Sequence, residues 1–191
     1  MNEIRIMLID DEASVLAALQ RMLRQRLSVP GQAMTVCTYS SPLAAIDAVQ
    51  ERSVDVVVCD FRMPELDGVE TLRRIKDLQP QTGRILLSGS REFDTVVDAV
   101  NVAQVCRIVL KPWEETELVQ AVRDAVETRR LRIENAELAD QVRVQRGLLT
   151  QQEAELRRIE HLWPGITRVE WGADGSVRIC DTDVIDSDLG P

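Results

Sequence analysis

The 191-residue sequence has little histidine, few aromatic residues and no long apolar run. Its only histidine is His161, which argues against a metal site built from several histidines and against a Ser-His-Asp hydrolase centre. No apolar run approaches the ~20 residues of a membrane-spanning helix, so no membrane partner is expected. The first residues lack a basic segment followed by a small-residue cleavage site, so no secretory signal is expected either.

Basic residues are outnumbered, and the cysteines are not paired. Lysine and arginine total 23 against 32 acidic residues, which gives a formal net charge of -9. This balance argues against a nucleic-acid partner, because nucleic-acid-binding surfaces need clustered basic side chains. The four cysteines show neither metal-ligand nor redox spacing. Unpaired cysteines are typical of a reducing compartment, so a cytoplasmic location is expected.

Short apolar runs alternate with helical patterns through the first two thirds of the chain. The run from Val54 to Cys59 is rich in valine, which indicates a strand buried on both faces of a parallel sheet. Four further strands are expected at 4–9, 35–39, 84–87 and 107–110, with amphipathic helices between them. The repeated β-α pattern predicts an α/β fold, a doubly wound parallel sheet with helices on both faces. This domain is expected to span 1–125.

A long helix is expected after this domain. Residues 114–162 contain no proline and only one glycine, Gly147. The second part carries a heptad pattern, with position d occupied by Leu131, Leu138, Gln145, Gln152 and Ile159, and position a by Asn135, Val142, Leu149, Leu156 and Trp163. The pattern predicts a coiled-coil helix over 126–163, continuous with the fifth helix of the domain, and a parallel homodimer. A single helix packed along its own domain is the alternative.

The end of the chain has two further patterns. Pro164-Gly165 ends the helix, and two alternating segments around a Gly-rich turn predict a β-hairpin within 164–180. The last residues, 181–191, are acidic and predict a disordered tail.

Polar residues follow four of the five expected strands. Asp10 and Asp11 follow the first, Asp60 the third, Ser88 the fourth and Lys111 the fifth. The carboxyl ends of parallel strands lie on one edge of the sheet, where ligands bind. Three carboxylates there would repel one another, and a divalent cation such as Mg²⁺ relieves this. A phosphoryl group on Asp60 would meet a metal ion, an ammonium and a hydroxyl.

Each of these parts has an ordinary explanation when taken alone. Asp10-Asp11 can cap a helix, and Ser88-Gly89 and Lys111-Pro112 can be plain turns. Their joint placement, one set at each strand end and in order, favours a phosphoryl-transfer site centred on Asp60.

Residues 1 to about 125 resemble the receiver domain of two-component response regulators. The matching motifs are Asp10-Asp11, Asp60-x-x-Met63-Pro64-x-x-Asp67-Gly68, Ser88-Gly89 and Lys111-Pro112-Trp113. The resemblance implies a flavodoxin-like sheet with strand order 2-1-3-4-5. It also implies that Asp60 accepts a phosphoryl group from the histidine of a sensor kinase. The chain would catalyse only its own phosphorylation and dephosphorylation, and would not otherwise be an enzyme.

The resemblance also implies roles for the other residues at the strand ends. Mg²⁺ would be bound by Asp11, Asp60 and the backbone carbonyl of Arg62, with Asp10 acting nearby or through water. Lys111 would contact the phosphoryl group, Ser88 would supply its hydroxyl beside that group, and the peptide bond from Lys111 to Pro112 would be cis.

Two features of the fifth strand bear on the output. The position three residues before Lys111 is often an aromatic switch residue in such domains, but in this chain it is Ile108. The stretch 107–114 is similar to a receiver subclass often fused to cyclic-di-GMP phosphodiesterases of the HD-GYP type, and the sequence has too few histidines for that output's metal site. Signalling is therefore expected through protein–protein interaction with an unidentified downstream protein, or through dimer rearrangement.

Two other functions remain open. The first is a divergent DNA-binding transcriptional regulator, against which the acidic charge argues. The second is a phosphatase with an Asp nucleophile. Such enzymes usually carry Asp-x-Asp after their first strand, whereas Asp60 follows the third.

Overall fold

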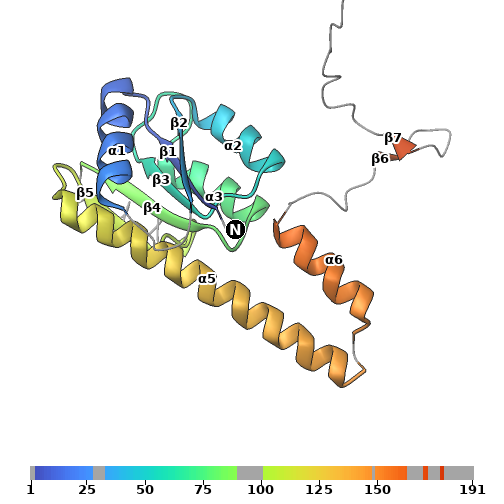
Figure 1. Cartoon of the computed structure of the whole chain (residues 1–191). Coiled ribbons are helices and arrows are strands. Elements are labelled where there is room, and N and C mark those ends of the chain that lie inside the picture. Colours follow the sequence, from blue (N-terminus) through green and yellow to red (C-terminus); the bar gives the residue numbers. More distant parts are fainter. Residues whose placement is uncertain are drawn as a thin grey trace, which may run out of the picture.

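The computed structural model describes residues 3–27, 33–89, 101–147, 149–162, 170–171 and 177–178. Five parallel strands form one sheet in the order β2-β1-β3-β4-β5, which confirms the order implied by the resemblance (Figure 1). The strands are β1 (Ile4–Ile9), β2 (Met34–Tyr39), β3 (Val56–Asp60), β4 (Gly83–Ser88) and β5 (Arg107–Leu110).

The strand β3 is the middle strand of the sheet, which explains its composition. All five of its residues are buried, as are all six residues of β4 beside it. A strand that is covered on both faces needs apolar side chains on both faces, and valine supplies them in β3. Asp60 is the last residue of this strand, so its carboxylate reaches the carboxyl edge of the sheet.

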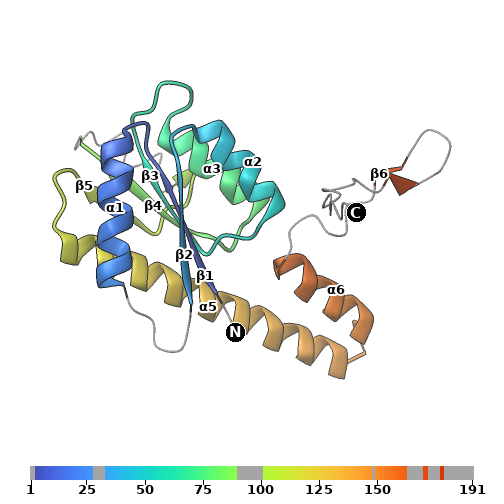
Figure 2. The same cartoon turned by 45° about the horizontal axis from the view of Figure 1, so that its top comes forward.

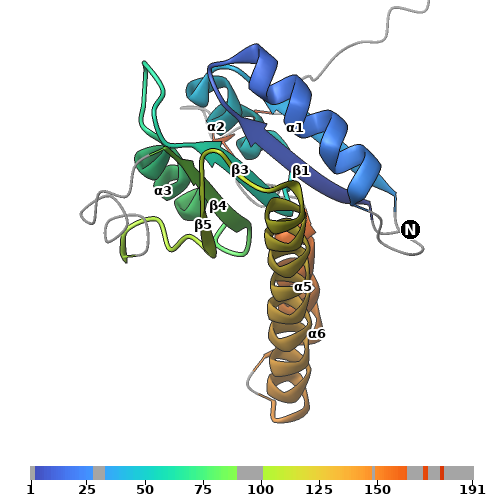
Figure 3. The ribbon, with the colours of Figure 1, turned by 90° about the vertical axis from the view of Figure 1, so that its left-hand side faces the viewer.

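Helices cover both faces of the sheet. On one face lie α1 (Ala13–Arg26) and the first part of α5 (Glu115–Gln145), and on the other lie α2 (Pro42–Glu51) and α3 (Gly68–Leu78) (Figure 3). Each face has its own apolar core. The α1 and α5 side includes Leu19, Leu23, Leu118 and Val122, and the other side includes Ile46, Val49, Leu72 and Ile75.

The prediction of one unbroken helix through 126–163 is wrong. The helix α5 ends at Gln145, and a second helix, α6 (Gln151–Leu162), follows a short turn. Gly147 has φ +70°, a left-handed conformation that ends a helix and that glycine adopts without a steric cost.

The start of α6 carries its own sequence signal. The Thr150 hydroxyl accepts a hydrogen bond from the Glu153 N–H (3.2 Å), and the Glu153 carboxylate accepts one from the Thr150 N–H (2.8 Å). This reciprocal arrangement is a capping box, which marks a helix start. Gly147 followed by this box predicts a break, and the heptad pattern conceals it.

The helix α6 folds back along the distal half of α5 (Figures 1 and 2). Asp140 of α5 joins the two helices, since it accepts hydrogen bonds from Arg143 of its own helix (2.6 Å) and from Arg157 of α6 (3.2 Å). The two helices line a cleft of about 630 Å³, so their packing is loose.

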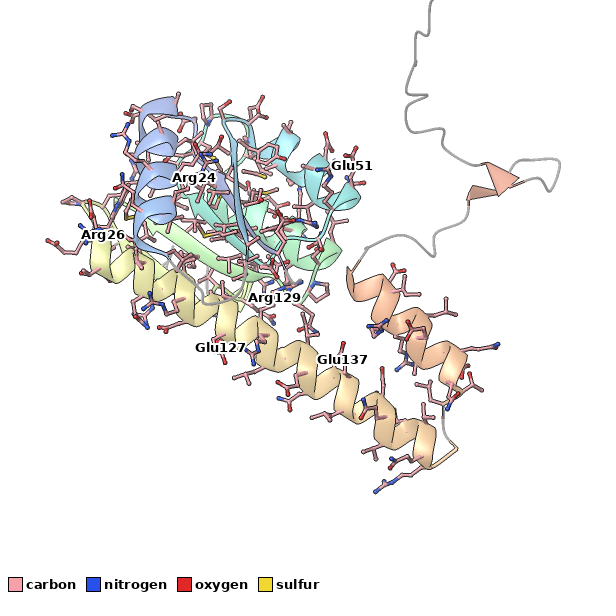
Figure 4. The ribbon with its side chains drawn as sticks, viewed as in Figure 1. Arg24, Arg26, Glu51, Glu127, Arg129 and Glu137 are labelled. Atoms are coloured by element: carbon pink, nitrogen blue, oxygen red, sulfur yellow. The ribbon has the colours of Figure 1, made fainter. Side chains whose placement is uncertain are left out.

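An ion pair connects α5 to the amino edge of the sheet. Arg129 contacts Asp55, the residue just before β3, and the other Asp55 oxygen accepts the backbone N–H of Arg5 in β1 (2.7 Å). Figure 4 shows the Arg129 side chain on the side of α5 that faces the sheet. The pair lies at the opposite end of β3 from Asp60, and it fixes α5 where the helix leaves the domain.

The remaining predictions are tested only in part. The strands β6 (Glu170–Trp171) and β7 (Val177–Arg178) pair antiparallel, as expected for the hairpin. The acidic tail at 181–191 lies outside the described residues, as does most of the segment between β4 and β5, where a helix is expected from the repeated β-α pattern. Among the helices that the structure describes, none is long and apolar enough to cross a membrane.

A buried arginine in β4 connects the segment before β4 to the segment before β5. Arg84 is only 1% exposed, and burial lowers its pKa below the usual value. Its guanidinium donates to four carbonyl oxygens, those of Pro80 (3.2 Å), Thr82 (2.7 Å), Ala103 (2.9 Å) and Gln104 (3.3 Å). The Arg84 side chain therefore ties two segments about 20 residues apart in sequence.

Arg84→Met is expected to lower the free energy of unfolding by more than about 2 kcal/mol. The substitution keeps the volume, but it leaves buried carbonyls without a donor, at about 1–3 kcal/mol for each unpaired group. Arg107→Met is the matched control, because the Arg107–Asp124 ion pair is half-exposed and should contribute under about 1 kcal/mol. Urea denaturation measures both, and equal losses would contradict the account.

Candidate functional site

Asp60 lies in a nearly closed site at the carboxyl edge of the sheet. Its side chain is buried, and its two oxygens have different partners. One oxygen, Oδ1, lies 2.6 Å from the Lys111 ammonium, and the other, Oδ2, accepts the backbone N–H of Arg62 (2.9 Å). The carboxylate is therefore held in one orientation by a cation and a backbone donor.

Asp10 is the second buried carboxylate of the site. Its Oδ1 accepts the backbone N–H of Glu12 (2.9 Å), and its Oδ2 accepts a hydrogen bond from Lys111 Nζ (3.1 Å). Burial raises the pKa of Asp10 above its ordinary value, and these hydrogen bonds offset the increase only in part. Asp10 and Asp60, which are 50 residues apart in sequence, thus share one ammonium group.

Lys111 is positioned by its backbone as well as by its charge. Its N–H donates to the Ser88 carbonyl (2.8 Å), which extends the pairing of β4 with β5 by one residue. The peptide bond from Lys111 to Pro112 is cis, as the resemblance implies. Burial opposes the charge on Lys111, but hydrogen bonds to Asp60 and Asp10 raise its pKa above the usual value. The ammonium therefore stays charged.

The other predicted site residues surround this trio. Ser88 is buried at the end of β4, next to β3. Asp11 and Arg62 are exposed and lie at the rim. Ile108, at the switch position, is partly buried and packs against the core on the α2 and α3 side. The structure thus brings Asp10, Asp60 and Lys111 into direct contact.

The Trp113 ring makes a contact that the sequence did not predict. Lys111 Nζ lies 5.9 Å from the centroid of the ring, within the range of a cation–π interaction. The Lys-Pro-Trp motif contained the signal, since a residue two positions beyond the lysine is within reach of its side chain.

The acidic residues fit a Mg²⁺ ion only as a partial site. Asp10 and Asp60 meet at one ammonium, which leaves a negative excess that a further cation would balance, and Asp11 is adjacent. Within the described ranges, no three histidine, cysteine or acidic side chains are grouped to hold a metal ion. Mg²⁺ commonly takes one or two carboxylates and completes its shell with water, carbonyl and phosphate oxygens, so the residues are compatible with it.

Gly68 allows α3 to start directly against the backbone of Asp60. A Cβ atom at position 68 would lie 2.1 Å from the Asp60 carbonyl oxygen and 2.9 Å from Leu86 Cδ1. The Gly68 N–H also donates to the Phe61 carbonyl (2.8 Å), and Asp67 caps the helix through the Glu70 N–H (2.8 Å). The Asp-Gly pair therefore fixes the loop that follows Asp60.

Gly68→Ala is expected to destabilise the fold by about 1–3 kcal/mol or more, because the backbone must move to admit the methyl group. The control is Gly89→Ala, where a Cβ atom meets no atom within 4 Å. Thermal unfolding of the two variants measures the difference. An unchanged melting temperature for Gly68→Ala would contradict the close approach.

Comparison with known proteins identifies the family of the domain that carries this site. Residues 6–123 match the family model described as the response regulator receiver domain. The chain belongs to the response regulator receiver family. The receiver match covers the whole sheet apart from the first two residues of β1, and it contains Asp10, Asp60 and Lys111.

Two curated relatives of the receiver extend the comparison. The hydrogenase transcriptional regulatory protein HoxA of Cupriavidus necator is 31% identical over 150 residues, which are 78% of this chain and 30% of the relative. The transcriptional regulatory protein ZraR of Klebsiella oxytoca is 30% identical over 130 residues, which are 68% of this chain and 28% of the relative. The chain therefore spans under a third of each relative's length.

Solved receiver structures support the same fold. A signal receiver domain of an HD domain-containing protein from Pseudomonas fluorescens has a TM-score of 0.62 and 29% identity, covering 70% of this chain and 94% of that one. A response regulator receiver domain protein from Clostridium thermocellum has a TM-score of 0.59 and 29% identity, covering 67% and 98%.

Proposed function

We propose that this receiver accepts a phosphoryl group on Asp60 from the phosphohistidine of a sensor kinase. The observation that carries the proposal is the contact of Lys111 with both Asp60 and Asp10, at 2.6 and 3.1 Å. This contact supports the proposal because the buried Asp60 carboxylate, the proposed nucleophile, lies beside an ammonium that can also donate to a phosphoryl oxygen.

The chemistry is a transfer between two covalent phosphoryl groups. A carboxylate oxygen of Asp60 attacks the phosphorus, the P–N bond breaks, and the imidazole leaves with the electron pair and takes up a proton. Lys111 then neutralises part of the phosphoryl charge, and the Arg62 N–H and Ser88 hydroxyl are donors near its oxygens. Since the acceptor is part of the chain, the protein is the substrate of this reaction and turns over no separate one.

Asp10, Asp11, Asp60 and the Arg62 carbonyl would hold a Mg²⁺ ion. When bound, the ion supplies a second positive charge for the phosphoryl oxygens. Without the ion, an anionic phosphoryl donor would face two buried carboxylates and a single ammonium, so its repulsion is expected.

Chelation tests this requirement. The full chain is incubated with acetyl phosphate and Mg²⁺, and its intact mass is measured. One phosphoryl group per chain is expected, EDTA should prevent its uptake, and excess Mg²⁺ should restore it. Equal uptake with and without EDTA would count against the metal, and no uptake under any condition would count against the proposal.

The output proposed for the phosphorylated receiver is protein–protein interaction or a rearranged homodimer. The continuity of α5 from the sheet to the turn before α6 supports this, because a single helix joins the core beside β4 and β5 to the distal helices. The downstream protein is unidentified, and a cytoplasmic location stays a prediction.

A DNA-binding regulator is the second candidate. It is favoured by the names of HoxA and ZraR as transcriptional regulatory proteins, of which this chain matches under a third. The net charge of -9 argues against DNA binding by these 191 residues. A gel shift with genomic fragments at low salt distinguishes DNA binding from an output through protein–protein interaction. A retarded band would favour the second candidate.

A further inference from the structure

The distal half of α5 has two different apolar stripes. One includes Ile133, Ala136 and Val144, which are partly buried and line the cleft against α6. It continues, at helical spacing, the face that packs on the sheet through Val122 and Ala125. The receiver and α6 therefore cover the same side of α5, one after the other.

The other stripe is exposed and carries the heptad positions. Leu131, Leu138 and Val142 are 48%, 51% and 45% exposed, and Asn135 is exposed between them. Their spacing of four, three and four residues places them on one line of the helix. We call these four residues the seam.

The seam faces away from the sheet and from α6. Figure 4 shows Glu127, at the edge of the seam line, on the side of α5 opposite Arg129. Glu137 lies on the α6 side and lines the cleft. The folded-back α6 thus leaves the seam uncovered, so a partner can cover the seam without displacing α6.

We propose that a second copy of this chain covers the seam, in parallel and in register, with the α6 helix of each copy on the outside. The proposal deepens the homodimer of the proposed function and rests on it only for its role in signalling. It differs from the predicted coiled coil over 126–163, because the contact is confined to the seam, 131–142, and excludes α6.

The charges beside the seam favour this occupant and orientation. Glu127 and Glu134 are at heptad position g, and Arg132 is at position e. In a parallel dimer, g faces e of the next heptad of the partner, so Glu127 meets Arg132 of the second copy. In an antiparallel dimer g faces g, and the two acidic positions would repel. Asn135 at position a favours two strands in a fixed register.

The seam has clear limits at both ends. Towards the sheet, the preceding heptad positions are Thr128 and Asp124, which are exposed and polar. Towards α6, the next position is Gln145, where the helix ends. Four core positions per chain make a short interface, so the dimer is expected to be weak and dependent on concentration.

Cysteine cross-linking tests the register. In full-length protein with Cys37, Cys106 and Cys180 changed to serine, Leu138→Cys and Leu131→Cys should each give a disulfide-linked dimer in oxidised glutathione. Arg130→Cys is the control, because its side chain is more exposed, at 66%, but lies off the seam. Equal yields at 130 and 138, or no dimer at either seam position, would overturn the proposal.

Sedimentation tests the place of α6. Leu138→Glu should raise the dimer dissociation constant at least about tenfold. Leu156→Glu, on α6 and 52% exposed, should leave it unchanged, whereas a continuous coiled coil would have Leu156 in its core. An equal effect of the two would overturn the placement of α6. Neither assay uses a phosphodonor, so failure of the seam and failure of phosphorylation at Asp60 are observed separately.

Discussion

Asp60→Asn is expected to take up no phosphoryl group from acetyl phosphate or from a phosphorylated kinase. The amide keeps the size of the side chain and can still accept the Arg62 N–H, but it has no anionic oxygen to attack phosphorus. Its hydrogen bond to Lys111 also loses one of its two charges. The measurement is phosphoryl incorporation, by radiolabel or by intact mass.

Asp67→Asn is the matched control for this loss. Asp67 lies in the same loop and caps α3 by accepting the Glu70 N–H (2.8 Å). Asparagine is an equally good N-cap, so the variant should fold and incorporate phosphoryl as the wild type does. Uptake by Asp60→Asn at the wild-type level would show that another residue is the acceptor.

Lys111→Met is expected to slow phosphoryl uptake roughly 10²- to 10³-fold, the usual loss when one preorganised donor is removed from a transition state. Methionine retains an unbranched apolar stem, but it loses the cation–π contact with Trp113 together with the charge. The ammonium, which lies within 3.1 Å of both buried carboxylates, is lost. The initial rate of uptake at fixed donor concentration measures the effect.

Lys76→Met provides the control, because the sequence contains only two lysines. Lys76 Nζ donates to the Val102 carbonyl (2.7 Å), and its side chain is partly buried on α3, away from Asp60. Loss of this contact should leave the rate of uptake unchanged. A Lys111→Met protein with the rate of the control would contradict a role for the ammonium in transfer.

The site was predictable from the sequence because its residues have local markers. Asp10, Asp60 and Lys111 each follow a recognisable strand, and parallel strands must end on one edge of the sheet. Topology therefore brings them together without any knowledge of distances. The sequence does not specify that Lys111 bridges the two carboxylates, because that depends on the packing of β5 against β4.

Features that depend on distant contacts could not be predicted. Arg84 is the second residue of a buried strand, where an arginine is unexpected, and it is accommodated because carbonyls at 80, 82, 103 and 104 converge on it. The side of α5 covered by α6 is likewise set by tertiary packing. The end of α5 at Gln145 is different, because Gly147 and the capping box at Thr150 mark it locally and the heptad pattern conceals them.

Reduction of the phosphorylated chain with borohydride tests the central claim, that Asp60 accepts the phosphoryl group, most directly. An aspartyl phosphate is reduced by borohydride to homoserine, and peptide sequencing then locates the altered residue. Full-length protein phosphorylated in Mg²⁺ should contain homoserine at position 60 and at no other aspartate. Homoserine at Asp10, Asp11 or Asp67, or a phosphoryl group on His161 instead, would contradict Asp60 as the acceptor.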